Sequence, residues 1–142
     1  MKIILDTNIL VAGLRSRQGA SFQILNLIPT GKIKFLLSIA LFLEYEATLK
    51  RSEFLKVAGL TVDDIDIILN LLAAKGEKIF EHYLWRPQLK DPHDEMVLEL
   101  AISGRAEAVV TFNQRDFIEV AEKFNLKIIM PADFYKILKG GL

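Results

Sequence analysis

The sequence contains no cysteine, which excludes disulfide bonds and thiolate metal sites. It has no apolar run near the roughly 20 residues that a membrane-spanning helix needs, and Asp6 interrupts any secretory leader pattern. Positive and negative charges balance, with 18 Lys and Arg against 18 Asp and Glu, so no global positive field attracts nucleic acid. We therefore expect a cytoplasmic protein without a membrane partner, in which only a local basic patch would hold nucleic acid.

Apolar residues are abundant, making up 51% of the 142 residues. This content predicts a single domain over residues 1–142 with an ample hydrophobic core. The mean hydropathy of +0.29 is high for a small soluble monomer. It indicates that a partner or a second copy covers some apolar surface.

The first ten residues, MKIILDTNIL, combine a short apolar run with an abrupt polar ending. Residues 3–5 are apolar on both faces, which is typical of a strand in the middle of a parallel sheet. Asp6, Thr7 and Asn8 then follow the carboxyl end of this strand. Ligands of open α/β sheets bind beyond that end, so Asp6 is the first candidate functional residue.

Strands and helices alternate along the rest of the chain. Further strands are expected over residues 33–37, 78–81, 107–111 and 127–130. We expect short helices over residues 53–58 and 117–124, and helices begun by Ser21, Ser38, Thr61, Asp91 and Pro131. The alternation predicts a three-layer α/β/α sandwich with a mainly parallel sheet of about five strands.

Acidic and amide residues form four clusters: Asp6; Asn113 with Asp116; Asp91 with Asp94; and Glu44 with Glu46. The first two clusters leave the same sheet edge if their strands are parallel. Asp94 shares a helical stripe with apolar residues 97, 98 and 101, so its side chain should point inward. Asp and Asn also commonly form turns and helix caps, which leaves a purely structural use open for each residue.

Four segments together resemble the PIN-domain nucleases: the strand running into DTN, then SIALFLEYEATLKR, DPHDEMVLELA and VVTFNQRDF. The resemblance covers nearly the whole chain, in the right order and spacing. It is closest to the toxin branch of bacterial and archaeal toxin–antitoxin systems, which includes the VapC-like ribonucleases. This resemblance implies an endoribonuclease that hydrolyses RNA phosphodiester bonds, with a small antitoxin protein as its partner.

The same resemblance implies which residues form the site. The catalytic, metal-holding acids would be Asp6, Glu44, Asp94 and Asp116, and Asn113 would be a further metal ligand where many members have Asp. Periodicity does not choose between Glu44 and Glu46, and only the family register favours Glu44. Supporting hydrogen bonds are expected from Thr7, Asn8 and Thr111, while Asp91 is either a helix cap or an outer acid.

Clustered carboxylates repel one another, and without a cation some would stay protonated. Hard oxygen ligands suit Mg²⁺ or Mn²⁺, which also bind substrate phosphate. Arg15, Arg17 and Arg115 lie near these motifs and are candidates for contacts to RNA phosphates, or else are ordinary solvated charges.

The two histidines, His82 and His93, do not suggest another site. For His93 we expect a solvent-facing or outer position rather than metal binding, because a lone His lacks the further ligands of a zinc site. His82 receives no role.

A homodimer through apolar helices is also implied, with candidate residues in the 65–72 helix and at Leu41, Phe42, Leu43 and Tyr45. The same residues would look identical if they filled the core.

Two other functions remain open. Asp6 could be a phosphoacceptor, but haloacid-dehalogenase-like phosphatases place a second Asp where this chain has Asn8, and the other residues of response-regulator receivers cannot be placed. The chain could also be a non-catalytic PIN-like module that binds RNA or protein.

Overall fold

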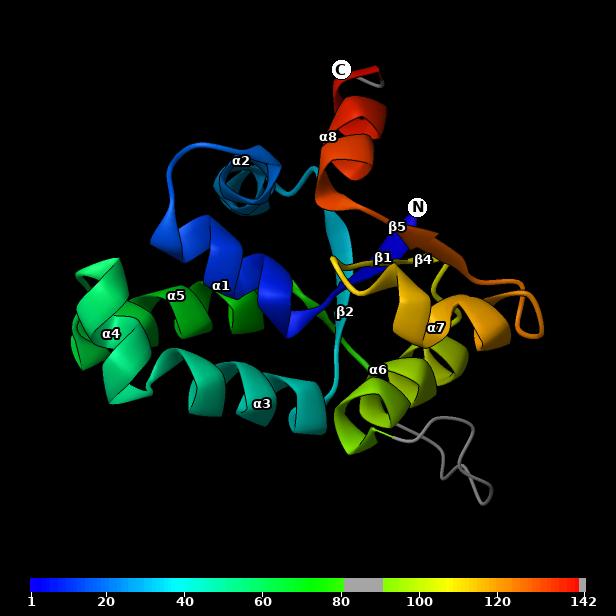
Figure 1. Ribbon diagram of the computed structural model, residues 1–142, viewed down its shortest axis with the longest axis horizontal. Coiled ribbons are helices and arrows are strands. Elements are labelled where there is room, and N and C mark those ends of the chain that lie inside the picture. Colours follow the sequence, from blue (N-terminus) through cyan, green and yellow to red (C-terminus); the bar gives the residue numbers. More distant parts are fainter. Residues whose placement is uncertain (81–90, 141–142) are drawn as a thin grey trace.

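A five-stranded sheet forms the centre of the protein in a computed structural model, which describes residues 1–80 and 91–140 (Figure 1). The strands are β1 (Lys2–Leu5), β2 (Lys34–Leu37), β3 (Glu77–Lys78), β4 (Ala108–Val110) and β5 (Lys127–Ile129). Their order is β3-β2-β1-β4-β5, with every neighbouring pair parallel. The strand that ends at Asp6 is therefore central, as predicted.

Helices cover both faces of this sheet, which confirms the predicted α/β fold class. Helices α6 and α7 lie on one side, and α1 and α2 lie on the other (Figure 1). Right-handed crossovers explain this arrangement, because the chain moves one way from β1 to β3 and back again to β4 and β5. The helices are α1 (Thr7–Arg15), α2 (Ala20–Leu27), η1 (Ile28–Thr30, a 3-10 helix), α3 (Ile39–Leu49), α4 (Ser52–Ala58), α5 (Val62–Lys75), α6 (Pro92–Ser103), α7 (Gln114–Ala121) and α8 (Pro131–Gly140).

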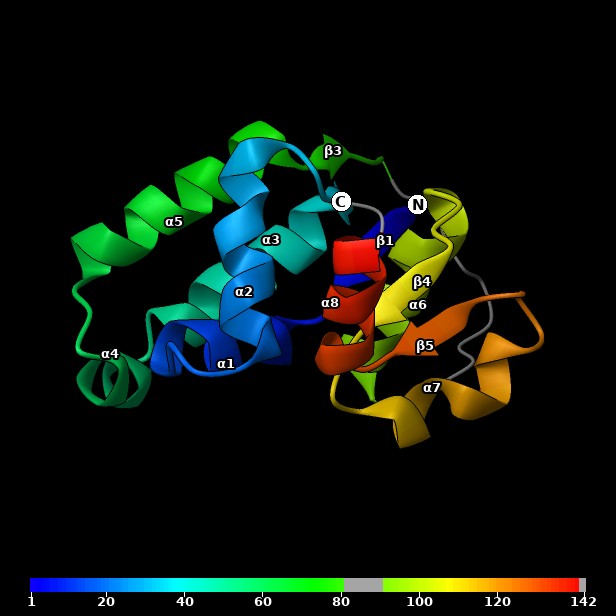
Figure 2. The same ribbon diagram turned by 90° about the horizontal axis from the view of Figure 1, so that it is seen from above.

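The core lies on both faces of the central strands. Ile3, Ile4 and Leu5 of β1 are completely buried, as are Val109 and Val110 of β4. Helix α8 returns to lie beside α2, so the end of the chain closes the layer that the first helices form (Figure 2). The carboxyl ends of β1 and β4 therefore lie next to a densely packed core.

Side-chain caps begin several helices where the sequence predicts them. Ser38 Oγ accepts the Leu41 N–H at 3.0 Å at the start of α3. Thr61 and Asp64 form a reciprocal capping box at the start of α5, with hydrogen bonds of 2.9 and 3.1 Å. These caps satisfy backbone donors that have no partner within the helix.

Several element boundaries differ from the sequence prediction. Ser21 does not cap α2, because the helix begins at Ala20 after Gly19, whose φ of 120° favours glycine. Helix α7 begins earlier than residue 117, and β3 is shorter than expected, although residue 81 lies outside the described residues. Helix α1 is not among the elements expected from the sequence; it covers residues 7–15 and begins directly after Asp6.

The apolar helices that suggested a dimer surface largely serve the core. Leu41 and Tyr45 are buried, and the Tyr45 hydroxyl donates to the carbonyl of Leu5 at the end of β1. Leu43 and Ile67 are exposed, at 53% and 68%. The homodimer stays a prediction, and the core explains most of its candidate residues.

Within the described ranges, no helix has both the length and the apolar character to cross a membrane.

Candidate active site

Asp6 sits at the carboxyl edge of the sheet because of strand register. Leu5 pairs with Val110 across the β1–β4 ladder, so the residues that follow the two strands lie side by side. The Asp6 N–H continues the ladder to the Val110 carbonyl at 3.0 Å. Asp6 is only 1% exposed, so its carboxylate oxygens depend on hydrogen-bond partners within the protein.

The Thr111 hydroxyl holds Asp6 in place from the neighbouring strand. It donates to Asp6 Oδ2 at 2.7 Å and accepts hydrogen bonds from Asn8 Nδ2 at 3.2 Å and the Asn113 N–H at 2.9 Å. Thr111 is fully buried, so these contacts are shielded from water. The hydroxyl therefore connects the ends of β1 and β4 through hydrogen bonds to Asp6, Asn8 and Asn113.

Thr7 supports Asp6 through its backbone. Its N–H donates to Asp6 Oδ1 at 2.8 Å, and the same contact caps the start of α1. The Thr7 hydroxyl is buried without a hydrogen-bond partner among the described residues. Asp6 thus performs two tasks, because it is both the helix cap and the buried acid of the site.

Asp94 lies in the first turn of α6 and points inward, as its helical stripe predicts, with 4% of its surface exposed. The pKa of Asp94 is raised to about 6, chiefly by burial and then by the negative charges of Asp91, Asp116 and Asp6, while the charge of His93 lowers it. Asp91 caps α6 by accepting the His93 N–H at 2.9 Å. Asp6, Asp91, Asp94 and Asp116 therefore share one electrostatic environment.

The imidazole of His93 lies between two of the acids. Its Nε2 is 2.7 Å from Asp6 Oδ1, and its Nδ1 is 3.6 Å from Glu44 Oε1. The hydrogen bond to Asp6 raises the pKa of His93, burial lowers it, and the charges of Asp6, Glu44 and Asp94 raise it. The sequence reading missed this contact, and the only available signal was the position of His93 directly before Asp94 in a helix start.

Glu44 and Glu46 diverge on α3. Glu44 approaches His93, whereas Glu46 pairs with Lys50 at 3.0 Å. Lys50 also contacts Asp66 of α5 at 2.6 Å. The structure therefore places Glu44, and not Glu46, at the edge that holds Asp6, in agreement with the family register.

Asn113 and Asp116 follow β4 at the same edge. Asn113 precedes α7, and its side chain makes no capping hydrogen bond there. Asp116 is exposed in the first turn of α7, and its charge reaches Asp94. The charge effect favours Asp116 as the partner of Asp94, while the metal-binding roles of both residues stay predictions.

The three candidate RNA-binding arginines are exposed. Arg15 ends α1 and lines a pocket of about 280 Å³ together with Phe112 and Pro131, which follow β4 and β5. Arg17 lies in the loop after α1, and Arg115 lies in the first turn of α7. None of the three forms an ion pair with another residue in the described part of the chain, so their charges are available to a ligand.

The carboxylate and amide side chains of the site are of the chemical types that bind a divalent cation. The negative charges of neighbouring carboxylates help to raise the pKa of Asp94, and a bound cation would offset their repulsion. Carboxylates are also the ligands that Mg²⁺ and Mn²⁺ prefer. Across residues 1–80 and 91–140, however, no group of three or more His, Asp or Glu side chains is gathered closely enough to hold a metal ion. The residues therefore fit the cation by type, and their side chains would have to converge to bind it.

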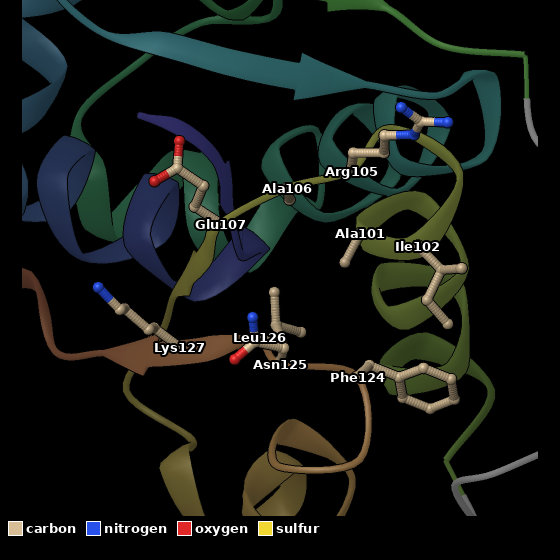
Figure 3. Close-up of a pocket in the computed structure, with 9 residues that line it drawn as sticks. All are labelled: Ala101, Ile102, Arg105, Ala106, Glu107, Phe124, Asn125, Leu126 and Lys127. Atoms are coloured by element: carbon tan, nitrogen blue, oxygen red, sulfur yellow. The ribbon is translucent and has the colours of Figure 1, made fainter.

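A pocket at the opposite edge of the sheet is separate from these acids. It has a volume of about 480 Å³ and lies where α6 ends and β4 and β5 begin (Figure 3). Its charged side chains do not converge, since Arg105 and Lys127 point away from each other (Figure 3). We assign no chemistry to this pocket.

The comparison with protein families agrees with the site. A sequence model described as a PIN domain matches residues 2–115, a range that includes Asp6, Glu44, Asp94 and Asn113 and ends one residue before Asp116. Neither the curated proteins nor the solved structures gave a match. PIN domains are typically nucleases and generally use divalent metal ions. The match spans well over half of the sequence, and the chain therefore belongs to the PIN-domain family.

Proposed function

We propose that the protein is an endoribonuclease that hydrolyses RNA phosphodiester bonds with the help of Mg²⁺ or Mn²⁺. The observation that carries this proposal is the buried Asp94, whose pKa is raised by burial and by three other acids at the carboxyl edge of the sheet. Perturbed acids at such an edge are typical of functional sites. Membership of a family of nucleases supports the same reaction class.

The cation would be held by Asp6, Glu44, Asp94 and Asp116, with Asn113 as a further oxygen ligand. When bound, it would neutralise charge on the scissile phosphate and activate water for attack. Thr111 and the Thr7 N–H fix the orientation of Asp6, so the carboxylate needs little rearrangement to act.

The arginines would hold the RNA backbone. Arg15, Arg17 and Arg115 are exposed and would contact RNA phosphates. Arg15 lines a pocket together with Phe112 and Pro131, which follow β4 and β5. Contacts to phosphates position RNA without reading its sequence, because the phosphates are alike in every nucleotide. The affinity should therefore depend strongly on salt.

The resemblance to the toxin branch extends this proposal to the biological role. In that role the protein would be the toxin of a toxin–antitoxin pair, would act in the cytoplasm on cellular RNA, and would be inhibited by a small antitoxin. It would also form a homodimer, for which the exposed Leu43 and Ile67 are the remaining surface candidates. Co-purification of the chain with the product of an adjacent short reading frame would test the pairing.

A cleavage assay tests the reaction. Purified protein is incubated with end-labelled single-stranded RNA in Mn²⁺, Mg²⁺ or EDTA, together with the variants Asp94→Asn and Asp6→Asn. Glu46→Gln is the control, because it likewise replaces a carboxylate by an amide, but at an acid that pairs with Lys50. We expect cleavage by wild type and the control in either metal, and none by the site variants or in EDTA.

Three results would overturn the proposal. Cleavage by Asp6→Asn at the wild-type rate would assign the activity to a contaminant. RNA binding without cleavage in any metal would instead identify the chain as a non-catalytic PIN-like module, and cutting of single-stranded DNA alone would change the substrate.

A further inference from the structure

His93 contains a buried ring nitrogen that has no hydrogen-bond partner among the described residues. This atom is Nδ1, although the side chain as a whole is 25% exposed. A buried nitrogen without a partner is costly, because it has lost its contact with water. The structure therefore leaves one coordination position of His93 unused inside the site.

The other ring nitrogen is held by Asp6. Nε2 lies 2.7 Å from Asp6 Oδ1, which already accepts the Thr7 N–H. The oxygen acts as an acceptor in both contacts, so Nε2 carries the hydrogen. A carboxylate that accepts one ring N–H is the usual arrangement around a histidine whose second nitrogen binds metal.

The free nitrogen faces a second acceptor. Glu44 Oε1 lies 3.6 Å from Nδ1, which is too long for a hydrogen bond. Two ligands of one ion, each about 2.1 Å from it, lie between about 3 and 4 Å apart. The separation of Nδ1 and Oε1 falls within this range.

Glu44 has the freedom to adjust around an ion. Its side chain is 36% exposed, and Thr48 Oγ1 donates to the same Oε1 over a long distance of 3.3 Å. Asp6, in contrast, is held by three donors and keeps His93 oriented. The buried Asp6 thus orients the nitrogen, and the more exposed Glu44 supplies the oxygen.

We propose that Nδ1 of His93 and the carboxylate of Glu44 are ligands of a divalent cation, and that Asp6 orients the imidazole through Nε2. For this ion Asp6 is a positioning residue and not a direct ligand, because Asp6 contacts the opposite nitrogen of the ring. This inference rests on the proposed function, because it assumes that a cation binds at this edge. An imidazole ligand suits transition metals, whereas Mg²⁺ prefers oxygen alone. His93 therefore makes the site selective for Mn²⁺ over Mg²⁺, contrary to the expectation from the sequence that it avoids metal.

Pulsed electron paramagnetic resonance of the full-length protein with Mn²⁺ tests this inference directly. The wild type should show hyperfine coupling between Mn²⁺ and a ring nitrogen, and His93→Gln should lose it. His82→Gln is the matched control, because His82 is the only other histidine of the chain, and it should keep the signal. Titration should show that His93→Gln weakens Mn²⁺ binding by at least about 10-fold and Mg²⁺ binding much less.

The outcomes separate this inference from the proposed function. Wild-type protein that binds Mn²⁺ without nitrogen coupling would overturn the role of His93 and leave the nuclease intact. Loss of the coupling in His82→Gln would also overturn it. A wild type that binds neither ion would overturn both. If His93→Gln does not fold, as judged by circular dichroism, the wild-type and His82→Gln spectra decide the question without it.

Discussion

The Thr111 hydroxyl donates a 2.7 Å hydrogen bond to Asp6 Oδ2 and so connects two residues that are 105 positions apart in the sequence. The two residues follow neighbouring parallel strands, and register alone brings them together. Because the hydroxyl also accepts from Asn8 and from the Asn113 backbone, it connects the groups around the acidic edge.

Replacing this hydroxyl should weaken both the fold and the site. Thr111→Val keeps the shape of the side chain but leaves Asp6 Oδ2 and two donors without their partner. We expect a loss of about 1–3 kcal/mol in the free energy of unfolding, measured by urea denaturation. Thr30→Val is the control, because its hydroxyl is exposed and should cost less than about 1 kcal/mol. A Thr111→Val protein as stable as wild type would contradict the role assigned to Thr111.

The metal-free protein should lose stability as the pH rises from roughly 5 to 8. The pKa of Asp94 is about 6 in the folded protein against 3.8 in the unfolded chain, so between these two pH values the folded state keeps a proton that the unfolded chain has released. The raised pKa of His93 acts in the same direction. The contribution of His93 to stability is complete below its unfolded pKa of 6.5 and is lost as the pH rises through its higher folded pKa.

Urea denaturation in EDTA at several pH values would measure this dependence. Asp94→Asn should remove about 1–3 kcal/mol of the pH-dependent change in the free energy of unfolding, mainly below pH 6. Adding Mn²⁺ should oppose the trend, because a cation favours the ionised carboxylates. Stability in EDTA that rises between roughly pH 5 and 8 would contradict the assigned environment of Asp94.

Arg15 should contribute to RNA affinity and not to chemistry. We expect Arg15→Ala, made in an Asp6→Asn background to prevent cleavage, to weaken binding and to reduce the slope of log K against log salt by about 1. Arg51→Ala is the control, because Arg51 is exposed after the far end of α3. Filter binding at several salt concentrations measures both slopes. Equal slopes for the two variants would remove Arg15 from the RNA-binding surface.

Most of the fold follows from simple sequence patterns. The apolar runs at residues 3–5 and 108–110 are buried on both faces and identify the central parallel strands. Helix α1 was not predicted, because the DTN motif reads as a turn and the following apolar residues have no clear separate start. The structure resolves this, since Asp6 is simultaneously the end of the strand and the cap of α1.

The site was predictable only in part, for a physical reason. Strand register places Asp6 beside Thr111, and the apolar stripe of α6 directs Asp94 inward; a sequence can specify both. The contact between His93 and Glu44 depends on how α6 lies against α3, which no local pattern encodes. Periodicity likewise does not separate Glu44 from Glu46; only the family register favours Glu44, and the structure adds that Glu46 pairs with Lys50.

Diffraction from crystals soaked in Mn²⁺ tests the central claim most directly. Anomalous scattering locates the ion independently of any activity, and binding requires the acids at the carboxyl edge to converge. The account predicts one or more peaks within bonding distance of Asp6, Glu44, Asp94 or Asp116 in wild-type crystals, and none there in Asp94→Asn crystals. A wild-type crystal with no peak at this edge would contradict a metal-dependent nuclease.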